Sequence, residues 1–343
     1  LHTGYDSSEE GQKKKRARDW PLLELDLAER PDHPFDLFNC GMTAHYEGRH
    51  PEAVGYLTMS IKNSGPDDSH LPKAYALKSV SLRDGGRPDE ALVTLDQGLA
   101  AVPGEPELLF LKGVLLANMG AHHEALDCYA QIPGTQPGRF SSVDLGIFTF
   151  KKQHNVAVCH LAMGDYLAAR HWFTEALRSA PWYTDSAVAL FEAAKSTGDP
   201  NGVLQAAEAV RAALGPGELW ATMHCARADM LGVPREAALE QLWRQFPQAE
   251  APGLLMLRPL LEQGDIGRAA PVLEHLDRTG SAEAAFVKGQ LSLRSGDFAS
   301  ALRHMKRAEQ RNPGHEQTKA QIAGIQQLLA EQEPVLNGHA EAI

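Results

Sequence analysis

The segment that decides the fold spans residues 113–129 and reads GVLLANMGAHHEALDCY. Gly113 and Ala125 stand twelve positions apart, Gly120 lies between them, and Tyr129 follows the alanine by four. Helices approach most closely where their side chains are small, and a glycine at the end of the first helix provides the turn. The same spacing of small residue and alanine occurs in five places: Gly41 and Ala53, Ser79 and Ala91, Gly113 and Ala125, Ala157 and Ala169, and Gly289 and Ala301. The sequence therefore predicts five helix–turn–helix units.

A large apolar residue follows each alanine by four positions, and a proline closes each unit. The large residues, which we expect to fill the space against the next helix pair, are Leu57, Leu95, Tyr129, Phe173 and Met305. Proline lacks an N–H, so it ends the second helix of the unit. Ala91 and Ala125 are 34 residues apart. The pattern resembles the tetratricopeptide repeat, and the resemblance implies an all-α, right-handed superhelical solenoid.

The repeat spacing weakens in the middle of the chain. Turns at Gly198, Gly232 and Gly264 predict divergent helix pairs at about 184–215, 218–247 and 252–279. We expect four well-matched units over 34–181, divergent repeats over 182–281, and a final unit with a capping helix over 282–332. Together these units make about eight helix pairs. The capping helix is expected because the last repeat would otherwise expose its apolar side. Residues 333–343 are expected to form a disordered tail.

An insertion interrupts the repeat spacing between Ala125 and Ala169, which are 44 residues apart, ten more than one repeat. The insertion falls within 133–149 and is rich in glycine, proline and serine, which predicts a loop. We expect this loop to lead into a helix that begins early, at Ser142. Whether the insertion is functional or merely tolerated is left open by the sequence.

Composition excludes several classes of function. The 343 residues include 33 Lys and Arg against 44 Asp and Glu, a net charge of −11, which argues against a nucleic-acid binder. The longest apolar stretch, 108–119, is broken by Lys112 and is too short to span a membrane. Four cysteines lie far apart, and we expect them to be reduced and buried, as is typical of a cytoplasmic protein.

Catalytic and metal-binding motifs are missing from the sequence. Nucleophile-elbow, zinc-protease and phosphate-loop motifs do not occur. His154 and His160 are six positions apart, so they point away from each other on a helix, and the other histidines form no zinc-type spacing. The chain is therefore predicted to have no enzymatic activity, no cofactor and no metal.

The first 45 residues carry a second resemblance. His2-Thr-Gly-Tyr5 precedes a basic run over 13–18, and a leucine-rich segment over 20–31 leads into Asp32-His-Pro-Phe-Asp-Leu-Phe-Asn-Cys-Gly41. This order resembles the junction in bacterial family 2 glycosyltransferases that carry C-terminal tetratricopeptide repeats, and the similarity extends over about 1–181. It implies that 1–31 is a linker with a basic helix after an upstream catalytic domain. His2 would contact a metal or a diphosphate only if that domain exists.

The resemblance to tetratricopeptide repeats also implies a concave groove lined by the first helix of each unit, where proteins or peptides dock. The groove candidates in the sequence are Phe38, Asn39, Met42, Tyr46, Lys73, Val80, Arg83, Phe110, Val114, Asn118, Lys151, His154, Asn155 and Val158. The mixture of aromatics, amides and cations favours a peptide with some acidic character. Trp220 and Trp243 either mediate self-association or pack inside.

Two functions remain open at this point. The first is a non-catalytic module that recruits a protein or an acceptor, as the C-terminal part of a glycosyltransferase. The second is a free-standing scaffold or regulatory adaptor without a catalytic domain. Neither involves nucleic acid or membrane insertion.

Overall fold

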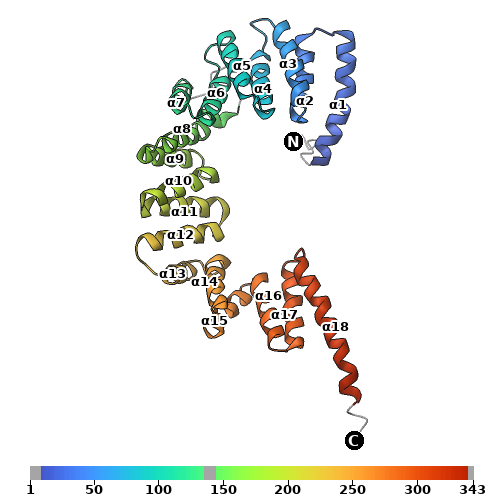
Figure 1. The fold of residues 1–343 in the computed structure, drawn as a ribbon, viewed down its shortest axis with the longest axis vertical. Coiled ribbons are helices and arrows are strands. Elements are labelled where there is room, and N and C mark those ends of the chain that lie inside the picture. The colour runs from blue at the N-terminus through green and yellow to red at the C-terminus, as the bar shows by residue number, and fades with distance from the viewer. Residues whose placement is uncertain (1–8, 135–143, 339–343) are drawn as a thin grey trace. The chain divides into compact units, whose positions relative to one another are not determined.

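The computed structural model describes residues 9–134 and 144–338, and the side chains from 19 to 330 within them (Figure 1). These residues form eighteen α-helices and one 3₁₀ helix, without a β-strand. The chain divides into two compact units, Leu1–Ala189 and Leu190–Ile343. Within the described residues, no helix is both long enough and apolar enough to cross a membrane.

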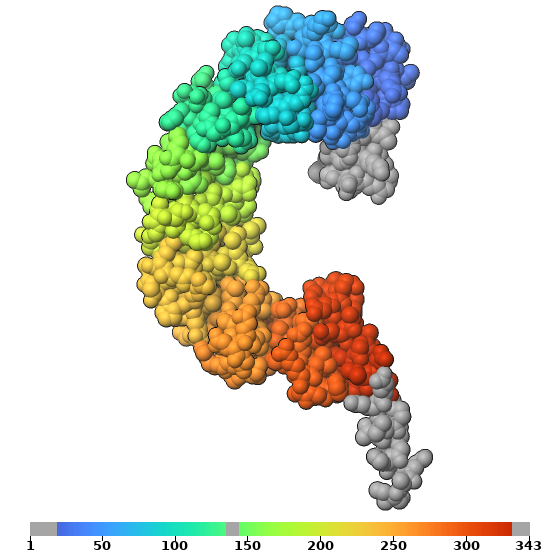
Figure 2. Space-filling model, viewed as in Figure 1, coloured from blue at the N-terminus to red at the C-terminus, as the bar shows by residue number. Residues whose placement is uncertain are grey.

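The first unit contains α1 (Glu9–Glu29) and four helix pairs. The pairs are α2 (Pro34–Tyr46) with α3 (His50–Asn63), α4 (Leu71–Asp84) with α5 (Pro88–Ala101), α6 (Pro106–Asn118) with α7 (His122–Ala130), and α8 (Phe150–Ala162) with α9 (Tyr166–Ser179). The 3₁₀ helix η1 (Leu145–Phe148) precedes α8. Successive pairs stack in chain order (Figure 2).

The second unit begins within α10 (Thr184–Thr197). Its other helices are α11 (Pro200–Leu214), α12 (Glu218–Met230), α13 (Arg235–Gln245), α14 (Glu250–Glu262), α15 (Ile266–Arg278), α16 (Ala282–Arg294), α17 (Phe298–Arg311) and α18 (Glu316–Gly338). Helix α18 packs on α17 and closes the unit. The predicted all-α solenoid of about eight helix pairs with a capping helix is confirmed.

Glycine makes the turn inside every pair. The eight turn glycines have φ between 66° and 85°, a region that other residues avoid, and they are Gly48, Gly86, Gly120, Gly164, Gly198, Gly232, Gly264 and Gly296. The N–H of Arg49 donates to the Ala44 carbonyl at 2.9 Å, and the same six-residue bond follows each turn glycine. This bond satisfies a carbonyl that the end of the first helix would otherwise leave unpaired.

In the three regular units whose small residue is glycine, this residue lies against the large residue of its own second helix. A Cβ built on Gly113 would come within 2.5 Å of the Tyr129 ring, and one on Gly41 would come equally close to Leu57. The sequence prediction placed the large residues against the next pair only. Tyr129 does both, because it also belongs to the apolar cluster that includes Phe148 and Cys159.

In the divergent pairs the close approach moves along the helices. In α14 and α15 it lies at Gly253, whose Cβ would meet the Leu276 side chain at 2.9 Å. In α10 and α11 it lies at Gly202, opposite Ala194. The fixed spacing of twelve residues misses these contacts because it assumes that every pair crosses at the same point.

Two helix ends differ from the sequence predictions. Helix α8 begins at Phe150 rather than Ser142, because Asp144 caps η1 and Thr149 has a non-helical backbone between η1 and α8. Helix α18 continues to Gly338, past the predicted end at Gln332. The rest of the predicted tail, 339–343, lies outside the described residues.

Helix α1 packs on the first pair through Trp20. The indole N–H donates to Glu47 at 2.9 Å, and the Arg49 guanidinium lies 4.6 Å from the ring centroid. The four cysteines are buried and unpaired, as expected: Cys40, Cys128, Cys159 and Cys225.

Candidate functional site

The first helices of successive pairs in unit 1 lie side by side. Helix α4 contacts both α2 and α6, and α6 also contacts α8. One position after the small crossing residue, each of these helices carries an apolar side chain. The four residues, which we call the A-face row, are Met42, Val80, Val114 and Val158. None of the four is fully buried, and Val158 is 36% exposed.

The amides near the row have different environments. Asn118 is exposed at the end of α6, and Asn39 is half-buried on α2. Asn155 donates to the Lys151 carbonyl of its own helix at 2.8 Å, so its amide N–H is used to hold local backbone. Asn39 and Asn118 therefore remain the amides best placed to meet a peptide backbone.

The cations of the predicted groove are neutralised within the chain. Lys73 forms an ion pair with Glu107 at 2.5 Å, and Arg83 with Asp84 at 2.8 Å. Lys151 forms an ion pair with Asp144. These pairs remove the basis for a preference for acidic peptides, which rested on unpaired cations.

Three other groove candidates are partly or wholly used in packing. Phe38 is buried against His70, at 5.4 Å between ring centroids, so it belongs to the core rather than to a binding face. Phe110 is half-buried, with its ring 6.0 Å from that of Tyr129. His154 makes a hydrogen bond to the Ser186 hydroxyl at 2.9 Å, and burial lowers its pKa. Tyr46, in contrast, is largely exposed.

Sequence reasoning missed an aromatic cluster beside α8. The Phe150 ring lies 5.1 Å from that of Trp182 and 4.8 Å from that of Tyr183, in edge-to-face geometry. Trp182 is 63% exposed although it is the largest side chain in the cluster. The sequence does contain a signal for this cluster, which is the tryptophan directly after Pro181. In the repeat pattern, Pro181 marks only the end of the fourth unit.

The second unit has a wide pocket between α13 and α15. Its volume is about 680 Å³, and Trp243, Met256 and Val272 are among the apolar residues that line it. Trp243 is half-buried with His275 against its ring at 4.5 Å, whereas Trp220 is completely buried. Trp220 therefore packs inside, which resolves half of the question that the sequence left open.

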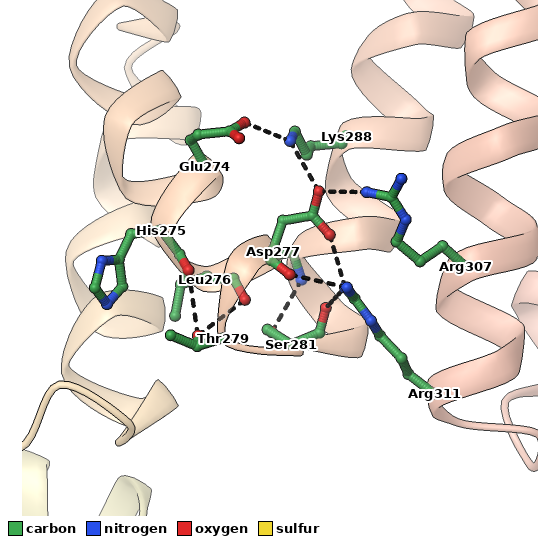
Figure 3. Close-up of polar contacts among 10 residues, drawn as sticks. Glu274, His275, Leu276, Asp277, Thr279, Ser281, Lys288, Arg307 and Arg311 are labelled. Atoms are coloured by element: carbon green, nitrogen blue, oxygen red, sulfur yellow. Dashed lines mark hydrogen bonds and ion pairs between the residues drawn. The ribbon is translucent and has the colours of Figure 1, made fainter.

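A buried carboxylate joins three helices in the second unit (Figure 3). Asp277 of α15 is only 5% exposed and forms ion pairs with Lys288 of α16 and with Arg307 and Arg311 of α17, at 2.7–2.9 Å. Glu274 shares Lys288 with it. Burial alone would raise the pKa of Asp277, but hydrogen bonds from Lys288 and Arg311 outweigh it and lower the pKa.

Metal and thiol chemistry find little support in the described part of the chain. No group of three or more His, Cys, Asp or Glu side chains could hold a metal ion there, and His2 lies outside it. Burial raises the pKa of Cys40 and of Cys159 to about 11, so both thiols are protonated at neutral pH.

Comparison with known proteins agrees with this architecture. A family model described as "Tetratricopeptide repeat" matches residues 77–139 and 254–316. No curated protein sequence matches the chain.

Solved structures with similar folds include other repeat proteins. A tetratricopeptide repeat protein from Parabacteroides merdae is 13% identical, with 85% of this chain and 98% of that chain covered and a TM-score of 0.45. The type IV pilus biogenesis factor PilW is 14% identical, with coverages of 65% and 98% and a TM-score of 0.47. YrrB, a repeat protein "with an unusual peptide-binding site", is 13% identical, with coverages of 58% and 94% and a TM-score of 0.43.

Identities this low say nothing about ligands or partners. The matched residues nevertheless fall on the helix pairs whose turns and crossings are described above, with one match in each unit. The tetratricopeptide repeat model thus matches one segment in each of the two units.

Proposed function

We propose that the chain is a non-catalytic protein-binding module and that unit 1 takes an extended peptide across α2, α4, α6 and α8. The observation that carries the proposal is the A-face row. It is a set of four partly exposed apolar side chains at equivalent positions on the first helices of four successive pairs. Burying such side chains against a partner contributes roughly 25 cal/mol per Å² of apolar surface.

The spacing of the row selects a peptide conformation. Packed helices lie about 8–10 Å apart. A polyproline II chain places every third side chain on the same face and advances about 9 Å over three residues. A peptide in this conformation therefore sets one apolar residue at each helix, and about ten residues cover the row.

A displayed library of random dodecapeptides, selected on the full chain, tests the proposal. Enriched peptides should carry apolar residues at a spacing of three. They should bind at least about tenfold more weakly to Val80→Glu and Val158→Glu, because each change sets a charge in an apolar contact.

Val93 provides the matched control. It is 55% exposed on α5, a second helix of its pair, so Val93→Glu places the same charge outside the A-face row. The control should bind the enriched peptides as the parent does. Equal binding by Val80→Glu and Val158→Glu, or a selection without enrichment, would contradict the proposal.

We also propose a setting for the module, which is a cytoplasmic bacterial glycosyltransferase whose acceptor the repeats recruit. The support is the resemblance of residues 1–45 to the junction that follows a family 2 catalytic domain. Reading the coding DNA upstream of Leu1 tests this directly. An in-frame domain with an Asp-x-Asp pair supports it, whereas a stop codon followed by a nearby start favours the free-standing adaptor.

A further inference from the structure

We propose that Trp182 and Asp185 form a subsite for an arginine side chain of the bound partner, at the N-terminal end of α10, the first helix after those of the A-face row. The inference rests on the proposed function, because it concerns the chemistry of the same peptide. It reverses the sequence prediction of an acidic ligand. Three observations support it: an exposed indole, an exposed carboxylate three residues later in the chain that forms no ion pair among the described residues, and local charge.

The indole of Trp182 is held in place but not covered. Its ring contacts those of Phe150 at 5.1 Å and Tyr183 at 6.3 Å, both edge to face. Tyr183 in turn contacts His154, whose ring lies 5.6 Å from that of the buried Phe173. The series of rings thus anchors Trp182 to the core and leaves it 63% exposed.

The carboxylate of Asp185 lies at the other end of the Tyr183 side chain. Burial raises the pKa of Tyr183, and the Asp185 charge and a hydrogen bond between the two side chains raise it further. Tyr183 therefore contacts the indole with its ring and interacts electrostatically with the Asp185 carboxylate. Asp185 is exposed, and among the residues that the structure describes it has no ion pair.

Neighbouring charges leave the subsite negative. Lys151 of α8, the residue after Phe150, is neutralised by Asp144. His154 faces Asp185, but burial lowers its pKa, so it is uncharged at neutral pH. The cluster therefore carries about one net negative charge, which attracts a cation.

Arginine fits these two groups better than lysine does. Its planar guanidinium stacks on an indole while its edge donates two hydrogen bonds to a carboxylate. Trp182 lies two residues before α10 and Asp185 in its first turn, and α10 is the first helix of the pair after α8. On α10 the position equivalent to the A-face row is Glu192, so the subsite lies toward the N-terminal end of this helix, where a partner that continues past α8 reaches it.

Three pools of labelled dodecapeptides test the inference on the full chain by fluorescence anisotropy. Each pool has valine at every third position and random uncharged residues elsewhere, and its two end residues are arginine, citrulline or glutamate. Citrulline keeps the shape of arginine without the charge. The arginine pool should bind about fivefold or more tightly than the other two, in line with a cation–π contact and a partly exposed charge pair.

The variants Trp182→Ala and Asp185→Asn should bring the ratio of arginine to citrulline affinity close to one. Both residues are exposed, so the fold should be retained. The exposed Leu167 on α9 and Asp89 on α5 supply matched controls, and Leu167→Ala and Asp89→Asn should keep the parent ratio.

The outcomes separate the two proposals. If all pools bind alike and binding still depends on Val80, the arginine subsite is wrong and the peptide site stands. If the preference for arginine survives both Trp182→Ala and Asp185→Asn, the subsite lies elsewhere. If no pool binds saturably, the proposed function fails and this inference fails with it.

Discussion

At the residue scale, close contacts between the helices of a pair depend on a few positions without a side chain. Gly113 is the clearest case, because any Cβ there would overlap the Tyr129 ring, which is itself almost completely buried. The spacing of glycine and alanine predicted such a contact from the sequence. Which large residue would fill it was not predictable, since that depends on how far one helix slides along the other.

Replacing Gly113 by alanine should destabilise the chain, although alanine is the better helix former. Overpacking in a filled core costs about 1–3 kcal/mol, more than the gain of up to about 1 kcal/mol in helix propensity. The free energy of unfolding, measured by chemical denaturation, should fall accordingly.

Gly55 supplies the control for this prediction. It also lies inside a helix, α3, but it is exposed and a Cβ there meets nothing within 4 Å. Gly55→Ala should leave stability unchanged or raise it by up to about 1 kcal/mol. Equal effects of the two substitutions would show that the contact at Gly113 is not tight.

The buried carboxylate of Asp277 should also matter at this scale. In Asp277→Asn, three cations lose their common counter-charge, and we expect a loss of about 1–3 kcal/mol because these cations are partly exposed. Glu274→Gln, which removes only an exposed partner of Lys288, should cost much less, because exposed ion pairs contribute little to stability.

The stability of the chain should depend on pH through Asp277, because the ionised form of this side chain is the stabilising one. Its pKa is lower in the folded chain than the usual 3.8. The contribution is therefore complete above about pH 4 and is lost as pH falls through the lowered folded-state pKa. Between about pH 5 and pH 2 the free energy of unfolding should fall more for the parent than for Asp277→Asn, and the difference should correspond to the titration of one carboxyl group. If the two plots of unfolding free energy against pH run parallel, this assignment is wrong.

At the element scale, helix pairs were easier to predict than their ends and contacts. The turn glycines Gly198, Gly232 and Gly264 located even the divergent pairs, because a residue with positive φ is needed at each turn. The position of α1 was not predictable, since Trp20 packs against Glu47 and Arg49 of another element. The Asp277 cluster likewise joins residues from three helices that no local pattern connects.

Ala125→Glu tests the pair as a unit. The side chain is completely buried where α7 crosses α6, and α6 also packs on α4, α5 and α8. A charge there should cost more than about 3 kcal/mol and unfold more than its own pair. A circular-dichroism melt should show a lower midpoint and reduced helical signal before the main transition.

His123→Glu is the control, because it places the same charge on an exposed position of α7. It should melt close to the parent. If Ala125→Glu also melts like the parent, the assignment of Ala125 to the helix crossing is wrong.

At the scale of the whole molecule, each pair contacts mainly its neighbours in the chain, so stability is expected to be local. The sequence predicted this architecture from repetition alone. It predicted the binding face only in part, because Phe38 is buried and the groove cations are neutralised by Glu107, Asp84 and Asp144. Exposure and charge pairing depend on residues one repeat away, which a repeat frame does not specify.

The central claim is that the first helices of unit 1 bind a peptide, and hydrogen exchange with and without an enriched dodecapeptide tests it most directly. The account predicts added protection in α2, α4, α6 and α8, with α3, α5 and α9 unchanged. Protection confined to those second helices, or to α13 and α15 around the pocket of the second unit, would contradict it.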